Sequence, residues 1–374
     1  MTSKKRFVYI SNMAAPYQVR FCDHLQQYFE TQFWFYEYMG ASRPDWWKIE
    51  LPPSCKVIDH LWFKWKERYV SFRVINMLNE FDPDIVMVGG FLIPSNYLVY
   101  RWAKRRKKKV IVFTETFRRR ETGQLRGKSI FNRLIELAYG DIDAIFACHE
   151  DARQQMVNVF DHFGSITHIA PYSSDIDRYF THPIRKKKEG YVYIFPNRLT
   201  ENYNPLLVLG IFAEIASMQP RSILKMNAQG ELFNDCRKFI SQQKLDKNVQ
   251  FLTHIKYWDD LSDIYRTSDI LLFPAKFSNG NFTIIEAMAS GMGIIVSNKI
   301  LGQTSLIRHG ENGFLCEPNK DEFLKAVQEY IAHPQYFESH ARINRDLVRS
   351  CSGEGTARLY AKLINEKVLS DLHG

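Results

Sequence analysis

Residues 279–296 read NGNFTIIEAMASGMGIIV, and the apolar run ILLFP at 270–274 precedes them. That run has no polar alternation, as expected of a parallel strand buried on both faces. The polar residues 276–281 predict a loop, and the glycines at 291 and 293 end a helix before a new strand begins at 294. One face of that helix carries Ile284, Ala287, Met288 and Gly291. The stretch therefore predicts half of a βαβ unit, with a helix N-terminus at a strand end, where open α/β sheets bind ligands and anions.

Glu286 stands out in this predicted helix because its neighbours Ile284, Ile285, Ala287 and Met288 are apolar. In one interpretation it is a first-turn glutamate that faces solvent and is stabilised by the helix dipole. In the other, its carboxylate binds the hydroxyl groups of a ligand. The residues alone leave both interpretations open.

Residues 277–298, FSNGNFTIIEAMASGMGIIVSN, resemble the donor-site motif of the retaining GT-B glycosyltransferases of family 4, the glycosyl transferases group 1, of the bacterial surface-polysaccharide type. That motif has two glutamates separated by seven residues. Glu286 matches the second, whereas Ser278 occupies the position of the first. The PNRL run at 196–199 resembles the family's GRL element, and HGENGFL at 309–315 resembles its DGENGLL element.

Length, composition and net charge limit the classes of protein to which this chain can belong. A chain of 374 residues is long enough for two domains. Its six cysteines are scattered without paired spacing, so neither a zinc site nor a disulfide framework is predicted. No apolar run reaches the length of a membrane-spanning helix, and the N-terminus lacks a signal-peptide pattern. We therefore expect a cytoplasmic protein, peripheral to the inner face of the plasma membrane, and the net charge of +9 indicates an anionic partner.

Strands and helices alternate along the N-terminal half, which predicts a parallel, doubly wound α/β sheet. The expected strands are 7–10, 32–37, 84–88, 110–113 and 144–147, and the expected helices include 95–106 and 151–160. Residues 169–180, IAPYSSDIDRYF, resemble the segment that closes the first domain of the family, and the charged run THPIRKKKEG at 181–190 predicts a linker. The resemblance implies the GT-B fold, with two Rossmann-like domains facing a cleft. Their expected bounds are 1–180 and 181–353, with a helix at about 354–374 crossing back to the first domain.

The resemblance also implies roles for individual residues. Glu286 is expected to accept hydrogen bonds from the ribose hydroxyls, and Arg198 to hold the diphosphate, on which negative charge collects as the glycosidic bond breaks. The family's partner lysine is replaced by Tyr203, so Lys276 is the candidate for a second cation. The expected donor-binding residues are Arg198, Gly230, His254, Ile255, Lys276, Ser278, Asn281, Phe282, Thr283 and Glu286. The expected catalytic residues are Glu115, Arg198 and Glu286.

The acceptor side is expected in the N-terminal half, at the exits of two predicted strands. Asn12, Pro16 and Tyr17 follow the first strand, and Glu115 follows the strand at 110–113. Such strand ends are where this fold class binds ligands. A single carboxylate at a strand end also serves as a helix cap or an ion-pair partner, and this second interpretation of Glu115 stays open.

The function that the resemblance implies is retaining, metal-independent hexosyl transfer from a UDP- or GDP-linked sugar. The acceptor would be a hydroxyl of a growing, lipid-linked glycan in surface polysaccharide synthesis, such as lipopolysaccharide or capsule. No cofactor is expected, and Asp175 and Asp177 are not interpreted as a metal-binding pair. Because Ser278 and Tyr203 depart from the family pattern, two alternatives remain: a GT-B-fold nucleotide-sugar epimerase and a non-catalytic nucleotide-sugar-binding partner subunit.

Basic and aromatic residues interleave in two further runs, WFKWK at 62–66 and FRRR at 117–120. These runs predict either contact with an anionic membrane surface or aromatic rings that pack inward beneath solvated cations. A third basic run, KRRKKK at 104–109, is interpreted as the solvated end of a helix. No nucleic-acid-binding module is recognisable, so nucleic acid is not an expected partner.

Overall fold

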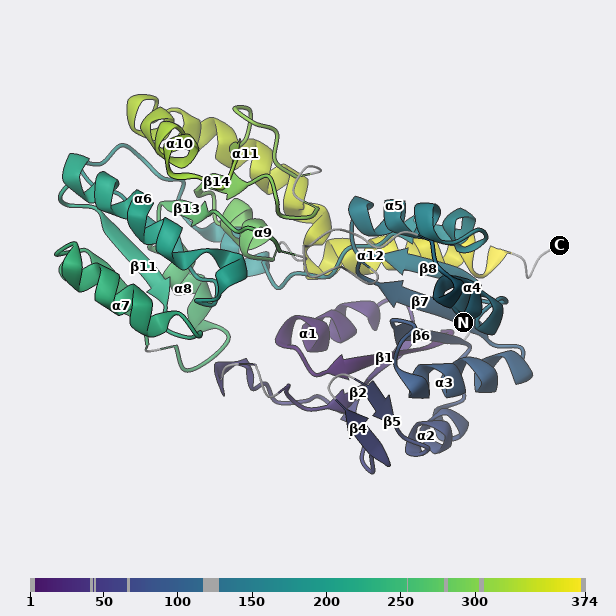
Figure 1. The fold of residues 1–374 in the computed structure, drawn as a ribbon. Helices are drawn as coiled ribbons and strands as arrows, with labels where there is room; N and C mark the ends of the chain where they lie inside the picture. The colour runs from purple at the N-terminus through teal and green to yellow at the C-terminus, as the bar shows by residue number, and fades with distance from the viewer. Residues whose placement is uncertain are drawn as a thin grey trace. The chain divides into compact units, whose positions relative to one another are not determined.

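The computed structural model describes residues 4–40, 43, 45–65, 68–116, 128–253, 255–278, 282–302 and 306–370. The chain divides into two compact units (Figure 1). Unit 1 comprises Met1–Asp175 and Ser350–Gly374, and unit 2 comprises Ile176–Arg349. No helix in the described part of the chain is both long and apolar enough to cross a membrane.

Unit 1 is built on a seven-stranded parallel sheet with the order β3-β2-β1-β6-β7-β8-β9. The strand order reverses between β1 and β6, which are hydrogen-bonded neighbours. The strands are β1 (Arg6–Met13), β2 (Glu30–Glu37), β3 (Cys55–Val57), β6 (Ile85–Gly89), β7 (Lys109–Thr114), β8 (Ala144–Ala147) and β9 (Thr167–Ile169). A separate antiparallel hairpin consists of β4 (Phe63–Trp65) and β5 (Arg68–Val70).

Both faces of this sheet are covered by helices. Successive side chains of a strand point to opposite faces, so each face has its own apolar core. In β1, Phe7 and Tyr9 belong to one apolar core, whereas Val8 and Ile10 belong to the other. The first core includes residues of α1 (Pro16–Leu25) and α12 (Gly353–Lys367), and the second those of α2 (Arg73–Phe81) and α3 (Pro94–Arg105). The remaining helices of the unit are α4 (Ile130–Ala138) and α5 (Glu150–Val159).

The C-terminal helix α12 returns to unit 1, as predicted. The ring of Tyr360 lies 5.0 Å from that of Phe21 on α1 and 5.3 Å from that of Phe146 on β8. The first residue of α12, Gly353, packs so closely on α1 that a Cβ atom there would lie 2.3 Å from the ring of His24. A side chain at this position would push α12 away from α1.

Unit 2 contains a six-stranded parallel sheet with the order β12-β11-β10-β13-β14-β15. Numbered within the unit, this is the 3-2-1-4-5-6 order of nucleotide-binding Rossmann folds. The strands are β10 (Val192–Phe195), β11 (Ile223–Asn227), β12 (Val249–Leu252), β13 (Ile270–Phe273), β14 (Gly293–Ser297) and β15 (Phe314–Cys316). The helices are α6 (Pro205–Met218), α7 (Phe233–Gln242), α8 (Asp260–Arg266), α9 (Phe282–Ala289), α10 (Lys320–Ala332) and α11 (Tyr336–Val348). The predicted architecture, two doubly wound α/β domains, is confirmed.

Candidate functional site

The point where strand order reverses in unit 2 lies between β10 and β13, which pair through Tyr193 with Ile270 and Ile194 with Leu271. Parallel sheets of this kind bind ligands in the crevice outside the carboxyl ends of such a strand pair. The two loops that leave these ends are connected, because the amide of Asn197 donates a hydrogen bond to the hydroxyl of Thr283 at 3.3 Å. The loop that contains Asn197 and Arg198 is thereby connected to the first turn of α9. Glu286 lies farther along the same helix.

Glu286 is half-buried on α9 and accepts a hydrogen bond of 2.6 Å from the hydroxyl of Tyr265 on α8. Burial raises the pKa of Tyr265 well above its usual value, and the nearby Glu286 carboxylate raises it further. The phenol therefore stays protonated at neutral pH and donates to Glu286. Since a carboxylate can accept about four hydrogen bonds, this contact fixes its orientation and leaves capacity for the hydroxyls of a ligand.

Arg198 lies in the loop after β10 with an exposed side chain that forms no hydrogen bond or ion pair with any described residue. The neighbouring loop after β11 packs against it, because the Leu199 amide donates to the carbonyl of Gln229 at 2.7 Å. Gly230 has a φ of +142°, and a Cβ atom there would lie 2.4 Å from the Leu199 carbonyl oxygen. Only glycine allows this approach, so Gly230 shapes the loop that carries Arg198.

The other predicted donor-binding residues also follow carboxyl ends of this sheet. Lys276, after β13, forms an exposed ion pair of 2.9 Å with Glu201. Ser278 is buried, and its backbone carbonyl accepts from the Leu301 amide at 3.0 Å. Tyr203, in place of the family's lysine, packs its ring 5.9 Å from that of Phe273. Phe282 and Thr283 begin α9, and Ile255 follows β12, whereas the predicted residues His254 and Asn281 lie outside the described residues.

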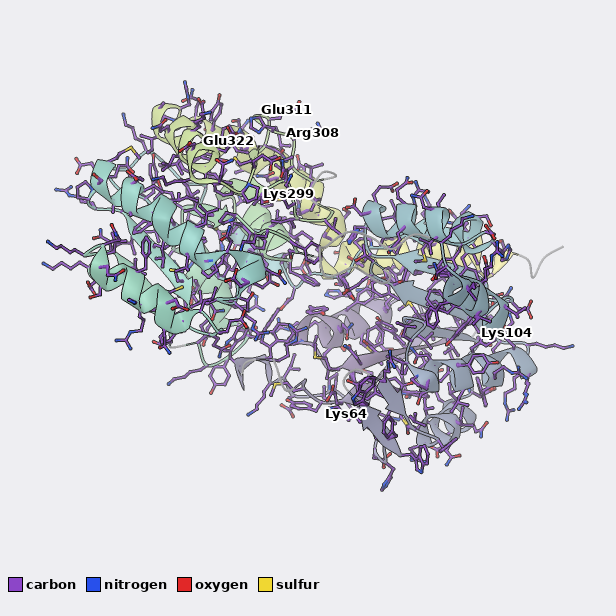
Figure 2. All side chains as sticks on the ribbon, in the orientation of Figure 1. Lys64, Lys104, Lys299, Arg308, Glu311 and Glu322 are labelled. Carbon is purple, nitrogen blue, oxygen red and sulfur yellow. The ribbon has the colours of Figure 1, made fainter. Side chains whose placement is uncertain are left out.

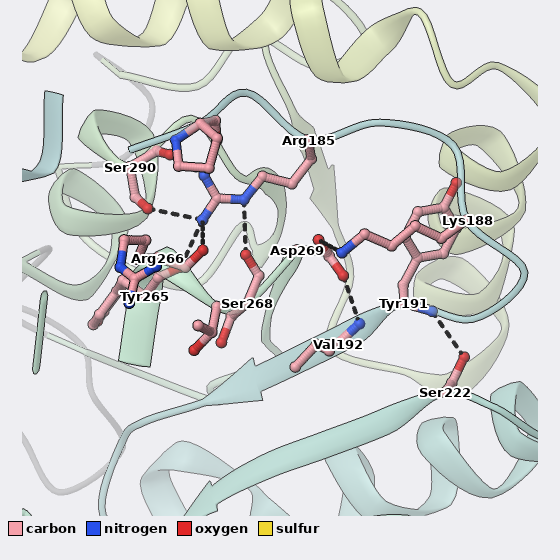
Figure 3. A network of polar contacts seen from close by, with 12 residues as sticks. Arg185, Lys188, Tyr191, Val192, Ser222, Tyr265, Arg266, Ser268, Asp269 and Ser290 are labelled. Carbon is pink, nitrogen blue, oxygen red and sulfur yellow. Dashed lines mark hydrogen bonds and ion pairs between the residues drawn. The ribbon is translucent and has the colours of Figure 1, made fainter. Parts of the chain in front are cut away.

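Behind this edge, a buried arginine joins the C-terminal ends of α8 and α9 (Figure 3). Arg185 donates to the carbonyls of Tyr265 at 2.6 Å and Ser268 at 2.8 Å, and also to the carbonyl and the hydroxyl of Ser290. Burial lowers the pKa of Arg185 to about 10, so its guanidinium is charged at neutral pH. The guanidinium thus stabilises the ends of the two helices that present Tyr265 and Glu286.

Neither Tyr265 nor Arg185 was predicted as a site residue from the sequence. Arg185 lies in residues 181–190, whose charge predicts a linker, yet the structure places that run inside unit 2 and leaves Arg185 only 6% exposed. A lone arginine in a charged run gives no signal of burial. Tyr265 belongs to an ordinary amphipathic pattern, and its contact with Glu286 becomes visible only once α8 and α9 are placed.

In unit 1, a cavity of about 800 Å³ lies at the carboxyl ends of β1, β6 and β7, where the strand order also reverses. Asn12 and Glu115, two of the predicted acceptor-side residues, line it. So do Arg43, Trp65 and Arg68, which the sequence did not single out for this role. The cavity therefore combines cations, a carboxylate and aromatic surface, as a site for a polar ligand requires.

Glu115 is held at this cavity by Tyr172, whose hydroxyl donates to it at 2.8 Å. Burial raises the pKa of Tyr172 well above its usual value, and Glu115 raises it further, so the phenol remains a donor. The ring of Tyr17, another predicted acceptor-side residue, lies 5.9 Å from that of Tyr172. Pro16 is buried at the start of α1 and does not line the cavity.

The described residues contain no group of three or more His, Cys, Asp or Glu side chains that could hold a metal ion. Each unit thus has its own candidate site: in unit 2 the sheet edge that carries Arg198 and Glu286, and in unit 1 the polar cavity lined by Asn12 and Glu115.

Comparison with known proteins identifies the class of this chain. Residues 179–346 match the family model described as glycosyl transferases group 1. The UDP-Gal:alpha-D-GlcNAc-diphosphoundecaprenol alpha-1,3-galactosyltransferase of Escherichia coli is 30% identical over 149 residues, which are 38% of this chain and 36% of that enzyme. The chain spans less than half of the length of the first curated relatives that it matches, 36–44%.

Solved structures show the fold over nearly the whole chain. A glycosyltransferase from Rickettsia africae superimposes with a TM-score of 0.74 at 14% identity, covering 98% of this chain and 99% of that one. The Anabaena protein HepE in complex with UDP-glucose gives a TM-score of 0.69 at 13% identity, covering 96% and 99%. At such identity the likeness concerns the fold alone. Residues 179–346 therefore match the glycosyl transferases group 1 family, and the chain as a whole has the GT-B fold.

Proposed function

We propose that this protein is a retaining glycosyltransferase that moves a sugar from a UDP- or GDP-linked donor to a hydroxyl of a lipid-linked glycan. The observation that carries the proposal is the connection of the Arg198 loop to α9 at the strand-order reversal of unit 2. A guanidinium and a carboxylate at one sheet edge match the two ends of a nucleoside diphosphate, its phosphates and its ribose diol.

The chemistry follows from these groups. Arg198 pairs with the diphosphate oxygens, and the pairing strengthens as the sugar leaves and negative charge develops there. Glu286, oriented by Tyr265, holds the ribose, so that the sugar is presented in one position. The leaving phosphate then assists deprotonation of an acceptor hydroxyl that attacks from the same face, without a metal ion. The cavity of unit 1 that contains Glu115 receives the acceptor.

The named relatives support the choice of donor and acceptor. The Escherichia coli enzyme is named for UDP-galactose and a diphosphoundecaprenol-linked sugar, and HepE was solved with UDP-glucose. These names make uridine nucleotides the first ligands to test. We further propose that the protein acts in surface polysaccharide synthesis on the inner face of the plasma membrane.

A thermal-shift screen against UDP, GDP and their sugars tests the proposal. At about 100 times the Kd, a nucleotide should stabilise the protein by about 2.7 kcal/mol. Arg198→Ala should lose most of this stabilisation, whereas Arg308→Ala should keep it, because the side chain of Arg308 is exposed and pairs, among the described residues, with Glu311 (Figure 2). Equal stabilisation of wild type and Arg198→Ala would remove Arg198 from the site, and no stabilisation by either nucleotide would refute the proposal.

The hydroxyl of Tyr265 is a second target, because it orients Glu286 without being placed against the ligand. Tyr265→Phe should weaken donor binding about tenfold, the effect of one hydrogen bond to a charged group. The matched control is Tyr193→Phe, since the buried hydroxyl of Tyr193 has no hydrogen-bond partner in the described structure. Donor titrations of both variants by calorimetry check this. Unchanged affinity in Tyr265→Phe would show that the contact does not position Glu286.

One observation favours a second candidate, a nucleotide-sugar-binding subunit without transferase activity. Ser278 replaces the first glutamate of the family motif, and Tyr203 replaces its lysine. Such a subunit would be stabilised by a nucleotide-sugar but would neither transfer nor hydrolyse its sugar. Release of free nucleotide from the donor, measured with and without an acceptor glycan, distinguishes the two candidates.

A further inference from the structure

A second cavity in unit 1, of about 500 Å³, lies between α2 and α3, and neither the donor edge nor the acceptor cavity shares a residue with it. Phe72, Ile75 and Leu98 give it an apolar lining, and Arg101, Arg105 and Arg106 lie along one side of it. Phe72 is 59% exposed although a phenylalanine is usually buried. We call these six residues the α2–α3 groove. An exposed apolar hollow of this kind marks a contact surface.

The groove lies within a strongly basic part of α3 and the turn after it. Seven of the nine residues 101–109 are lysine or arginine. Lys104 and Lys109 pair with Asp143, and Lys108 pairs with Asp82, whereas the other four form no ion pair with a described carboxylate. The sequence interpretation of 104–109 as a solvated helix end accounts for the paired lysines. It does not account for the apolar hollow beside Arg101 and Arg105, neither of which forms an ion pair with a described carboxylate.

The β4–β5 hairpin extends this surface with aromatic residues. Trp62, which precedes β4, is 76% exposed, and its ring lies 6.3 Å from that of Phe72. Phe63 and Trp65 on β4 are also exposed, whereas Lys64 forms an ion pair with Glu37. Exposed rings next to the arginines of α3 suit the boundary between lipid tails and head groups, where aromatic side chains gather at membranes. The second basic–aromatic run, 117–120, lies outside the described residues.

We propose that the α2–α3 groove binds an anionic phospholipid and thereby docks unit 1 on a membrane surface. The apolar lining takes part of an acyl chain, while Arg101 and Arg105, one helical turn apart on α3, pair with the phosphate. Arg106 and Lys107, the other two cations without an ion pair, attract further anionic head groups. A phospholipid fits both halves of the surface, since a nucleic acid leaves the apolar hollow without a contact and a neutral lipid leaves the arginines without one.

Vesicle co-sedimentation of the full chain tests this proposal. The wild-type protein should bind vesicles of phosphatidylcholine mixed with phosphatidylglycerol, and not vesicles of phosphatidylcholine alone. The double variant Arg101→Gln/Arg105→Gln should bind the anionic vesicles about thirtyfold more weakly, because each cation contributes about fivefold near an anionic surface. Phe72→Ser should also weaken binding, and its effect should persist at high salt, where charge attraction is screened.

The control is the double variant Arg221→Gln/Arg342→Gln, which removes the same charge from exposed arginines of unit 2. It should bind anionic vesicles as the wild type does. If it loses binding to the same extent as Arg101→Gln/Arg105→Gln, only net charge matters and the groove is not a site. Binding to phosphatidylcholine alone, or binding of a single-stranded oligonucleotide but of no vesicle, would also overturn the proposal. Nucleotide-induced thermal stabilisation should be unchanged in all variants, so this test is independent of the proposed transferase function.

Discussion

Replacing Glu286 with alanine is expected to abolish sugar transfer and to weaken donor binding at least about a hundredfold. The carboxylate can accept two hydrogen bonds from a ribose diol, and a hydrogen bond to a charged group contributes about 1.5–3 kcal/mol. Loss of both bonds corresponds to at least two powers of ten in the dissociation constant. The fold should survive, because Glu286 is half-buried at the edge of unit 2 and the apolar residues of α9 remain in place. Donor titration and the release of nucleotide in the presence of acceptor measure the two effects.

Glu338→Ala provides the matched control for this substitution. Glu338 is an exposed glutamate in the first turn of α11, and its ion pair with Arg342 lies on the surface. Its replacement should change neither donor affinity nor turnover. Wild-type turnover in Glu286→Ala would exclude Glu286 from the site. A loss of turnover without a loss of donor affinity would instead assign Glu286 to the reacting sugar rather than to the ribose.

The fold was predictable because parallel strands that are buried on both faces appear in the sequence as short apolar runs. The predicted strands 110–113 and 144–147 lie within or coincide with β7 (Lys109–Thr114) and β8 (Ala144–Ala147). The returning helix was also predicted, from the resemblance to the family. Short edge elements were not: β3 and β9 each have three residues, too few for any periodicity to appear. The helix α11 was also missed, because its buried face includes His340 and Asn344, which do not form an apolar stripe.

The candidate site was predictable only where a motif fixes a residue to a strand end. Arg198, Gly230 and Glu286 follow the carboxyl ends of neighbouring strands, as the sequence pattern predicts. The residues that orient these groups come from segments far apart in the chain. Tyr265 reaches Glu286 from α8, and Tyr172 reaches Glu115 across 57 positions of sequence. Whether a tyrosine hydroxyl contacts a carboxylate depends on how the helices pack. A local sequence pattern does not predict that packing.

Replacing Arg185 with methionine is expected to lower the free energy of unfolding of unit 2 by at least about 3 kcal/mol. Methionine fills a similar volume, so the main loss is that of the hydrogen bonds to the carbonyls at the ends of α8 and α9. Each buried acceptor left without a donor costs about 1–3 kcal/mol. In a unit of this size the melting temperature falls by about 2–4 °C for each kcal/mol, so a fall of at least about 6 °C is expected in thermal unfolding.

The control for Arg185→Met is Arg221→Met, which removes an arginine of the same unit whose ion pair with Glu189 is fully on the surface, both side chains being 78% exposed. Exposed ion pairs contribute about 0–1 kcal/mol, so this variant should melt within about 4 °C of the wild type. Arg185→Lys distinguishes charge from geometry, because an ammonium cannot reach the carbonyls of Tyr265, Ser268 and Ser290 together. It should be nearly as destabilised as Arg185→Met. If Arg185→Lys melts as the wild type does, the buried charge alone suffices, and the idea that the planar guanidinium holds α8 and α9 in the positions needed for Tyr265 to meet Glu286 is wrong.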